Sequence, residues 1–206
     1  MPSVARRGKN GRARRGTVEQ HVFEAVERLL AGGETYTALG IQRIADEAGI
    51  ARSSFYLNFA DKSDLLIRLA DAATGDLFGV AEERLSSPEA LTPEALRETF
   101  LSVVAEYRRN ASALGALNEV AAYDAGVASF WRVRVEAFGD ALRDRLRLDL
   151  AAGRVAPDLD VDFTAHWIVW GSERSVAQHV AAGATDDDRL ATAVARSVWW
   201  TMYGGA

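Results

Sequence analysis

Apolar side chains recur every three or four residues along most of this chain, with polar side chains between them. That spacing is typical of amphipathic helices. It predicts helices at about 17–31, 93–109, 111–122, 125–151, 160–182 and 186–203. Another long helix is expected to follow Asp61 and to end before Ser86-Ser87-Pro88. With two short helices between 40 and 59, the pattern predicts nine helices and an all-α fold with little room for strands.

The segment between Gly40 and Phe59 predicts two short helices that are separated by a glycine. The first has one apolar face, formed by Ile41, Ile44, Ala45 and Ala48. Gly49 then stands where a helix end often needs a left-handed residue, and Ile50 can fold back onto the helix. The second helix begins near Arg52 and buries two aromatic side chains, Phe55 and Phe59. This pattern predicts a helix-turn-helix, which places its second helix in a DNA major groove.

Composition narrows the class of protein. The chain contains no cysteine, so neither a disulfide framework nor a thiolate metal site is expected. Its apolar runs are shorter than the roughly 18 residues of a membrane span. The basic N-terminus lacks the apolar stretch of a signal peptide. We therefore expect a cytoplasmic protein without a membrane partner, associated with the nucleoid when it binds DNA.

Charge is distributed unevenly, although the net charge is only −5. Residues 1–62 carry ten Lys and Arg side chains against seven Asp and Glu, and the remaining residues carry 14 against 22. The first 16 residues hold six basic side chains and no acidic one. A polyanion is therefore expected to bind at the N-terminal end of the chain.

The segment from Ile41 to Leu66 resembles the TetR-like transcriptional regulators. The likeness depends on two runs, Ile44-Ala45-Asp46-Glu47-Ala48-Gly49-Ile50 and Phe55-Tyr56-Leu57-Asn58-Phe59-Ala60-Asp61-Lys62. A Trp-rich final helix ending in Tyr203-Gly204 also fits. Within the family, the chain is most similar to the subgroup of the mycobacterial ethionamide-resistance regulator. It departs from the family pattern at Gly40 and Ala51, where Ser or Thr often caps a helix.

The chain is expected to have three parts: a flexible basic arm (1–16), a helix-turn-helix DNA-binding domain (17–62) and an effector-binding and dimerisation domain (63–206). The resemblance implies a homodimeric repressor that binds a double-stranded, inverted-repeat DNA operator and is released by a small hydrophobic effector. Two alternatives remain, a DNA-binding dimer without an effector and a transcriptional activator. The basic arm either enters a minor groove or serves as a solubilising tail.

Eight side chains are candidates for DNA contacts: Gln42, Arg43, Arg52, Ser53, Ser54, Tyr56, Leu57 and Lys62. Arg52 can donate two hydrogen bonds to guanine, and Leu57 can contact a thymine methyl group. The resemblance places Tyr56 and Lys62 on the phosphate backbone. Other interpretations remain, because Ser54 can face the helix packing and Arg43 can pair with Glu47 four residues later.

Aromatic side chains are frequent in the predicted effector domain, and tryptophan offers both a large apolar face and one hydrogen-bond donor. The candidate effector-binding residues are Phe100, Val104, Tyr107, Asn118, Trp131, Arg134, Phe138, Trp167, Trp170 and Trp199. Taken singly, aromatic residues at helical spacing more often belong to a core. The resemblance favours a pocket for the set, with Asn118 and Arg134 either orienting a ligand or lying on solvated faces.

The last two predicted helices carry many small side chains, among them Ala177, Ala191 and Ala195. Small side chains permit close packing of helices. By resemblance, these two helices from each chain are expected to form a four-helix dimer interface.

The sequence favours a regulator over an enzyme. A di-metal site in a helical bundle needs Glu-x-x-His pairs, and none occurs. The three histidines are scattered, and neither a Gly-rich phosphate loop nor a Gly-x-Ser-x-Gly elbow is present. No catalytic residue, metal or cofactor is therefore predicted.

Overall fold

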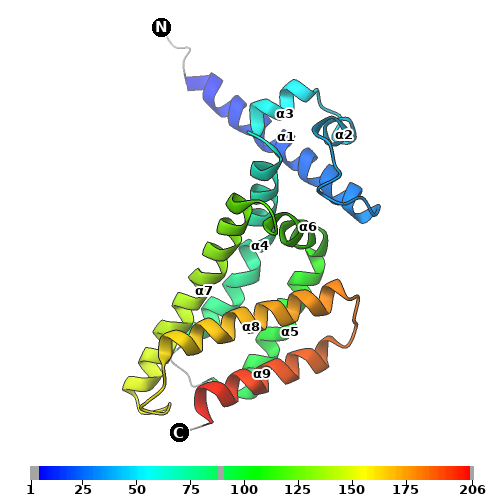
Figure 1. Cartoon of the computed structure of the whole chain (residues 1–206). Coiled ribbons are helices and arrows are strands. Elements are labelled where there is room, and N and C mark those ends of the chain that lie inside the picture. Colours follow the sequence, from blue (N-terminus) through cyan, green and yellow to red (C-terminus); the bar gives the residue numbers. More distant parts are fainter. Residues whose placement is uncertain (1–4, 88–90, 205–206) are drawn as a thin grey trace. The chain divides into compact units, whose positions relative to one another are not determined.

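A computed structural model describes residues 5–87 and 91–204, and within these ranges the secondary structure is entirely helical (Figure 1). The helices are α1 (Ala5–Ala31), α2 (Ile41–Glu47), α3 (Arg52–Asn58), α4 (Lys62–Ser86), α5 (Pro93–Arg109), α6 (Ala111–Ala121), α7 (Ala125–Ala151), α8 (Val161–Ala181) and α9 (Asp187–Tyr203). The predicted all-α fold is confirmed. Apart from the start of α1, the helix ends agree with the predicted ones to within a residue or two.

The start of α1 differs most from the prediction. The helix begins at Ala5. The sequence suggested a start at Thr17, because the apolar stripe is absent before that residue. The predicted start is therefore wrong. Arginine, lysine and alanine have high helix propensity, so a segment rich in them can be helical without an apolar face. Residues 1–4 of the expected arm lie outside the described residues, and the arm's part in DNA binding stays a prediction.

The chain folds as two compact units. The first unit contains Met1–Asp71 and Ser112–Ala128, and the second contains Ala72–Ala111 and Ser129–Ala206. The sequence suggested three consecutive parts, 1–16, 17–62 and 63–206. A linear pattern cannot show that residues 112–128, which include most of α6, belong to the first unit.

In the first unit, the helix-turn-helix packs against α1 around two buried rings. Phe55 and Phe59 are buried, and their ring centroids lie 5.2 Å apart. The turn has the predicted glycine cap, because Gly49 has φ +66° and its N–H donates to Asp46 O at 3.2 Å. The Ile50 N–H donates to Ala45 O at 3.0 Å, which completes a Schellman motif. This cap fixes the direction of the chain between α2 and α3.

In the second unit, α5 and α9 lie side by side, and α8 contacts both. Thr92 caps α5 as predicted for a residue before Pro93, since its hydroxyl accepts the Ala95 N–H at 3.1 Å. The small side chains Ala177, Ala191 and Ala195 are buried within this unit. They support packing inside one chain, so they do not by themselves mark a dimer surface.

Candidate DNA-binding surface and effector cavity

The outer face of α3 is exposed and chemically mixed. Arg52 and Ser53 are exposed, and the exposed fractions of Tyr56 and Leu57 are 48% and 77%. Phe55, between them, is completely buried. Because α3 is only seven residues long, this single buried ring fixes which side of the helix faces outward. We name Arg52, Ser53, Tyr56 and Leu57 the α3 face.

Arg52 and Tyr56 orient one another on this face. The Arg52 guanidinium donates to the Tyr56 hydroxyl at 3.3 Å and lies 5.8 Å from the ring centroid. Tyr56 also meets the buried Phe55 ring edge-on, with centroids 5.6 Å apart. A guanidinium has five N–H donors, so the bond to Tyr56 uses only part of its capacity. The pair therefore presents an oriented cation and a hydroxyl at the surface.

The candidates on α2 make ordinary helix-surface contacts in this structure. Gln42 donates to Asp46 at 2.7 Å. Arg43 pairs with Glu47 at 3.3 Å, which is the alternative that its spacing suggested, and also with Glu34 at 3.2 Å. Contacts of Gln42 and Arg43 with phosphate stay predictions.

Ser54 and Lys62 are less exposed than the residues of the α3 face. Ser54 is half-buried, and its carbonyl accepts a hydrogen bond from Asn58 at 2.7 Å. The Lys62 ammonium donates to the Tyr36 carbonyl at 2.7 Å and to the Thr37 carbonyl at 3.2 Å. Burial lowers the pKa of Lys62. Its role in this structure is to hold the loop before α2, and its contact with phosphate stays a prediction.

Within the first unit, long-range polar contacts hold the end of α6 and the loop that follows it, and the sequence did not indicate them. The Thr37 N–H donates to Glu119 at 3.0 Å, and the Thr37 and Tyr123 hydroxyls lie 2.6 Å apart. The Ser63 hydroxyl donates to Asp124 at 2.6 Å. We name Glu119, Tyr123 and Asp124 the α6 fastening. Its partners are at least 61 positions apart in the chain, so no local spacing could have indicated it.

The second unit contains an apolar cavity. About 870 Å³ of empty space, part of it open to solvent, lies between side chains of α4, α5, α7, α8 and α9. Four predicted effector-binding residues line it: Phe100, Tyr107, Trp131 and Phe138. The sequence did not indicate the other lining residues, which are Arg84, Leu85, Leu91, Leu96, Thr99, Val103, Val135, Leu142, Ile168, Val169, Ser172, Glu173, Val176, Val198 and Met202.

The remaining predicted effector-binding residues lie elsewhere. Val104 is completely buried, Trp167 is 51% exposed and Arg134 is half-buried, and none of these three lines the cavity. Asn118 belongs to α6 in the first unit. The Trp199 indole N–H donates to the Leu91 carbonyl at 3.1 Å. Residue type alone suggested these positions, whereas the cavity is lined by the inward-facing side chains of five helices.

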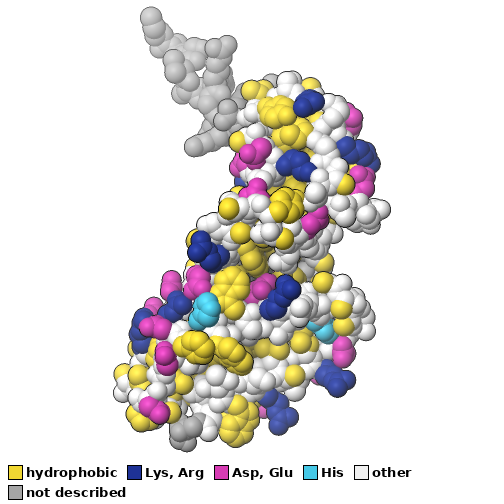
Figure 2. All heavy atoms as spheres, viewed as in Figure 1, with side chains coloured by type: hydrophobic (Ala, Val, Ile, Leu, Met, Phe, Trp, Pro, Cys, Tyr) yellow, Lys and Arg dark blue, Asp and Glu magenta, His cyan; other side chains and the backbone are white. Residues whose placement is uncertain are grey.

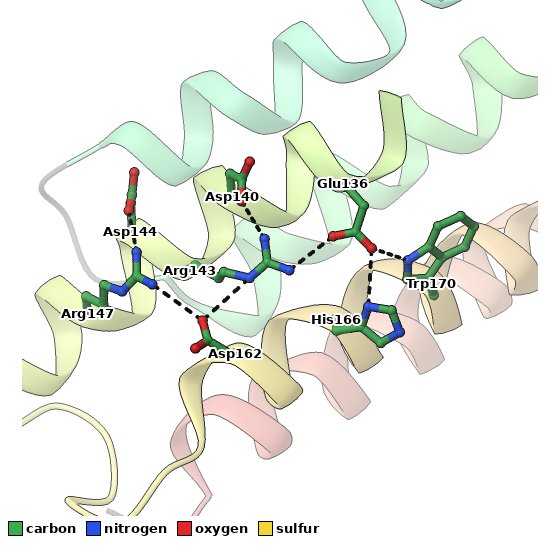
Figure 3. A network of polar contacts seen from close by, with 8 residues as sticks. All are labelled: Glu136, Asp140, Arg143, Asp144, Arg147, Asp162, His166 and Trp170. Carbon is green, nitrogen blue, oxygen red and sulfur yellow. Dashed lines mark hydrogen bonds and ion pairs between the residues drawn. The ribbon is translucent and has the colours of Figure 1, made fainter. Parts of the chain in front are cut away.

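Trp170 belongs to a polar network between α7 and α8 (Figure 3). Its indole N–H donates to Glu136 at 2.9 Å, and Glu136 also pairs with Arg143 at 3.1 Å. Arg143 lies 3.7 Å from Asp162, which joins the two helices a second time. The hydrogen bond from Trp170 is the largest cause of a lowered Glu136 pKa. In this structure Trp170 therefore joins two helices, and its role in ligand binding stays a prediction.

Metal binding and membrane insertion find no support among the described residues. No group of three or more His, Asp or Glu side chains there could hold a metal ion. Within the same part of the chain, each helix is too short or too polar to cross a bilayer.

The exposed helix-turn-helix lies within a segment that matches a known family. Residues 28–69 match the sequence model of the bacterial regulatory proteins of the tetR family. The chain therefore contains a TetR-family DNA-binding segment. It is a DNA-binding transcriptional regulator rather than an enzyme. The matched residues contain α2 and α3 completely, so the TetR-like segment includes the α3 face.

Solved structures share the fold of this chain over most of its length. FadR from Bacillus subtilis, solved in complex with stearoyl-CoA, is 19% identical with a TM-score of 0.70 and covers 89% of this chain and 99% of its own. The fatty acid degradation regulator FadR from Bacillus halodurans is 17% identical with a TM-score of 0.69, covering 88% and 94%. PfmR from Thermus thermophilus is 19% identical with a TM-score of 0.65, covering 86% and 96%. No curated protein matches the chain.

Proposed function

We propose that this TetR-like regulator is a repressor that binds an inverted-repeat operator as a dimer and is released when a small apolar effector enters the cavity. One observation carries the proposal: the matched helix-turn-helix presents Arg52, Tyr56 and Leu57 outward from α3. A helix of this length fits across a major groove about 12 Å wide. Arg52 reads guanine, Leu57 reads a thymine methyl group, and Tyr56 binds phosphate.

The proposed dimer surface is the exposed side of α8 and α9. Phe163 and Trp167 on α8 are 67% and 51% exposed, and Trp200 on α9 is 60% exposed. Figure 2 shows hydrophobic side chains gathered over α8 on the face that it draws. Large exposed apolar patches commonly mark an interface. A second copy is the proposed occupant, since a two-fold dimer places two α3 helices about one DNA turn, ~34 Å, or a multiple of it apart.

Effector control is proposed as a shift between two populations. A molecule in the cavity favours a state in which the two DNA-binding surfaces no longer match adjacent grooves. Each tenfold preference for that state contributes about 1.4 kcal/mol. The stearoyl-CoA complex of one structural relative supports a role for the cavity. Membership of the ethionamide-resistance subgroup and a cytoplasmic location, on the nucleoid when DNA is bound, are parts of this proposal.

The test begins by selecting duplexes that the full chain retains from a random pool. We expect a palindrome with half-sites about 10 base pairs apart, or a multiple, and a dimer on each site in sedimentation. Transcription of a reporter behind that site should fall when the protein is added. If the reporter is activated, the proposed repressor is an activator instead. If the protein binds no duplex even at low ionic strength, the proposal is overturned.

A further inference from the structure

One acidic side chain stands in the wall of the otherwise apolar cavity. The aromatic part of the lining is Phe100, Tyr107, Trp131 and Phe138. Among the lining residues of the described chain, Glu173 of α8 is the single carboxyl group. An ionised carboxylate in apolar surroundings is costly unless it is paired or hydrogen-bonded. Its position therefore depends on hydrogen-bonding partners, from the cavity wall or from a molecule in the cavity.

Two buried donors hold Glu173 in place. The Tyr107 hydroxyl donates to Glu173 Oε1 at 3.3 Å, and the Trp131 indole N–H also hydrogen-bonds the carboxyl group. Tyr107 and Trp131 are themselves buried, so they orient the carboxyl group firmly. A carboxylate has about four acceptor positions on its two oxygens. Two donors leave positions on Glu173 for a ligand.

The electrostatics of this site favour a donor over an acceptor. Burial raises the pKa of Glu173, and it outweighs the opposing effects of the hydrogen bonds from Tyr107 and Trp131 and of the charge on Arg174, so the charged form is only partly compensated. A ligand N–H or a cation would supply that compensation, whereas a second anion would add repulsion. The aromatic rings that line the same cavity favour a cation further.

We propose that the effector is an elongated apolar molecule with a donor nitrogen, an amine or its ammonium form, and that this nitrogen binds Glu173. The occupant's role as an effector rests on the proposed function, but its chemical class does not. The proposal separates this cavity from one built for fatty acids, whose polar end is an anion. Arg84, the other charged lining residue, lies 3.9 Å from Glu98 and thus already has an acidic neighbour.

The test compares three probes with the same ten-carbon chain: decylamine, decanol and decanoate. Each is titrated calorimetrically into the full-length protein at pH 7, below its micelle concentration. We expect decylamine to bind at least tenfold more tightly than decanoate, with decanol between them. In Glu173→Gln, decylamine should lose at least tenfold in affinity, and decanol should change less than threefold. Glu94→Gln, an exposed carboxylate on α5 outside the cavity, serves as the matched control.

Several outcomes would overturn the inference. Decanoate could bind as tightly as decylamine, the preference for decylamine could survive in Glu173→Gln, or none of the probes could bind. If Glu173→Gln does not fold, the comparison of the three probes in the wild-type protein still decides the charge preference. The titration needs no DNA. A protein that bound no duplex would therefore overturn the proposed function but not the inference about the ligand.

Discussion

The two candidate binding regions of this regulator are built in opposite ways. The α3 face comes from seven consecutive residues, and the ring beneath it is completely buried. The cavity comes from five helices between Arg84 and Met202, and its aromatic side chains surround empty space. In the first region the core is filled, and the local sequence predicts which residues are exposed. The second is a hollow whose walls only long-range packing defines.

The largest expected effect contrasts the two kinds of core. Phe55→Ala should lower the free energy of unfolding of the first unit by ~3–5 kcal/mol, because it opens a cavity in close packing. Phe138→Ala should cost only about 1–2 kcal/mol in the second unit, because its ring already borders a hollow. Amide hydrogen exchange resolved by peptide measures each unit separately. Equal losses in the two units would contradict the contrast.

The next effect concerns DNA. Arg52→Ala should weaken operator binding by ~1–3 kcal/mol, or roughly 5- to 150-fold, if its guanidinium reads a guanine. Fluorescence anisotropy with the selected duplex measures this change. Arg132→Ala, an exposed arginine of the second unit, is the matched control and should bind as the wild type does. An Arg52→Ala protein that binds normally would remove the α3 face from the DNA site.

Lys62 separates a structural role from a DNA-binding one. Lys62→Met should destabilise the first unit by ~1–2 kcal/mol, because the carbonyls of Tyr36 and Thr37 lose a charged donor. Hydrogen exchange of α2 and α3 should then rise. The salt dependence of operator binding tests the predicted phosphate contact, whose loss would lower the log–log slope by about 0.9. An unchanged slope with faster exchange would leave Lys62 a structural residue.

The smallest expected effect is a pH dependence in the α6 fastening. The hydrogen bond from Ser63 is the main cause that lowers the pKa of Asp124, followed by the backbone N–H of Val127. Since the folded pKa is below the unfolded value of about 3.9, this stabilisation is complete above that value. It is lost as the pH falls through the folded pKa. Ser63→Ala should show a weaker loss of stability below about pH 4 in an acid titration followed by circular dichroism.

In that titration, Ser129→Ala provides a matched hydroxyl removal in the second unit. It should leave the acid response of the first unit unchanged. An identical acid response in the wild type and Ser63→Ala would mean that the hydrogen bond does not hold the end of α6.

Much of the fold follows from local sequence. Thr92 and Pro93 define the start of α5, and Gly49 defines the turn between α2 and α3, because caps and left-handed residues act over a few positions. The start of α1 was not predictable from apolar spacing, because Arg-rich helix can continue where that spacing stops. Periodicity reports which face is buried, and it says less about where an exposed helix begins.

The two candidate sites also differ in how far local sequence predicts them. The outward position of Arg52 and Tyr56 follows from the spacing of Phe55 and Phe59, since both rings must be buried on one side of a short helix. Glu173 could not be recognised in this way, because its neighbours Tyr107 and Trp131 come from other helices. Sequence by itself determined the helices, their caps and the outward face of α3, all of which depend on residues within a turn or two of each other. Only the tertiary structure decided which aromatic residues enclose the cavity and that a carboxyl group stands in its wall, because packing brings together residues far apart in the chain.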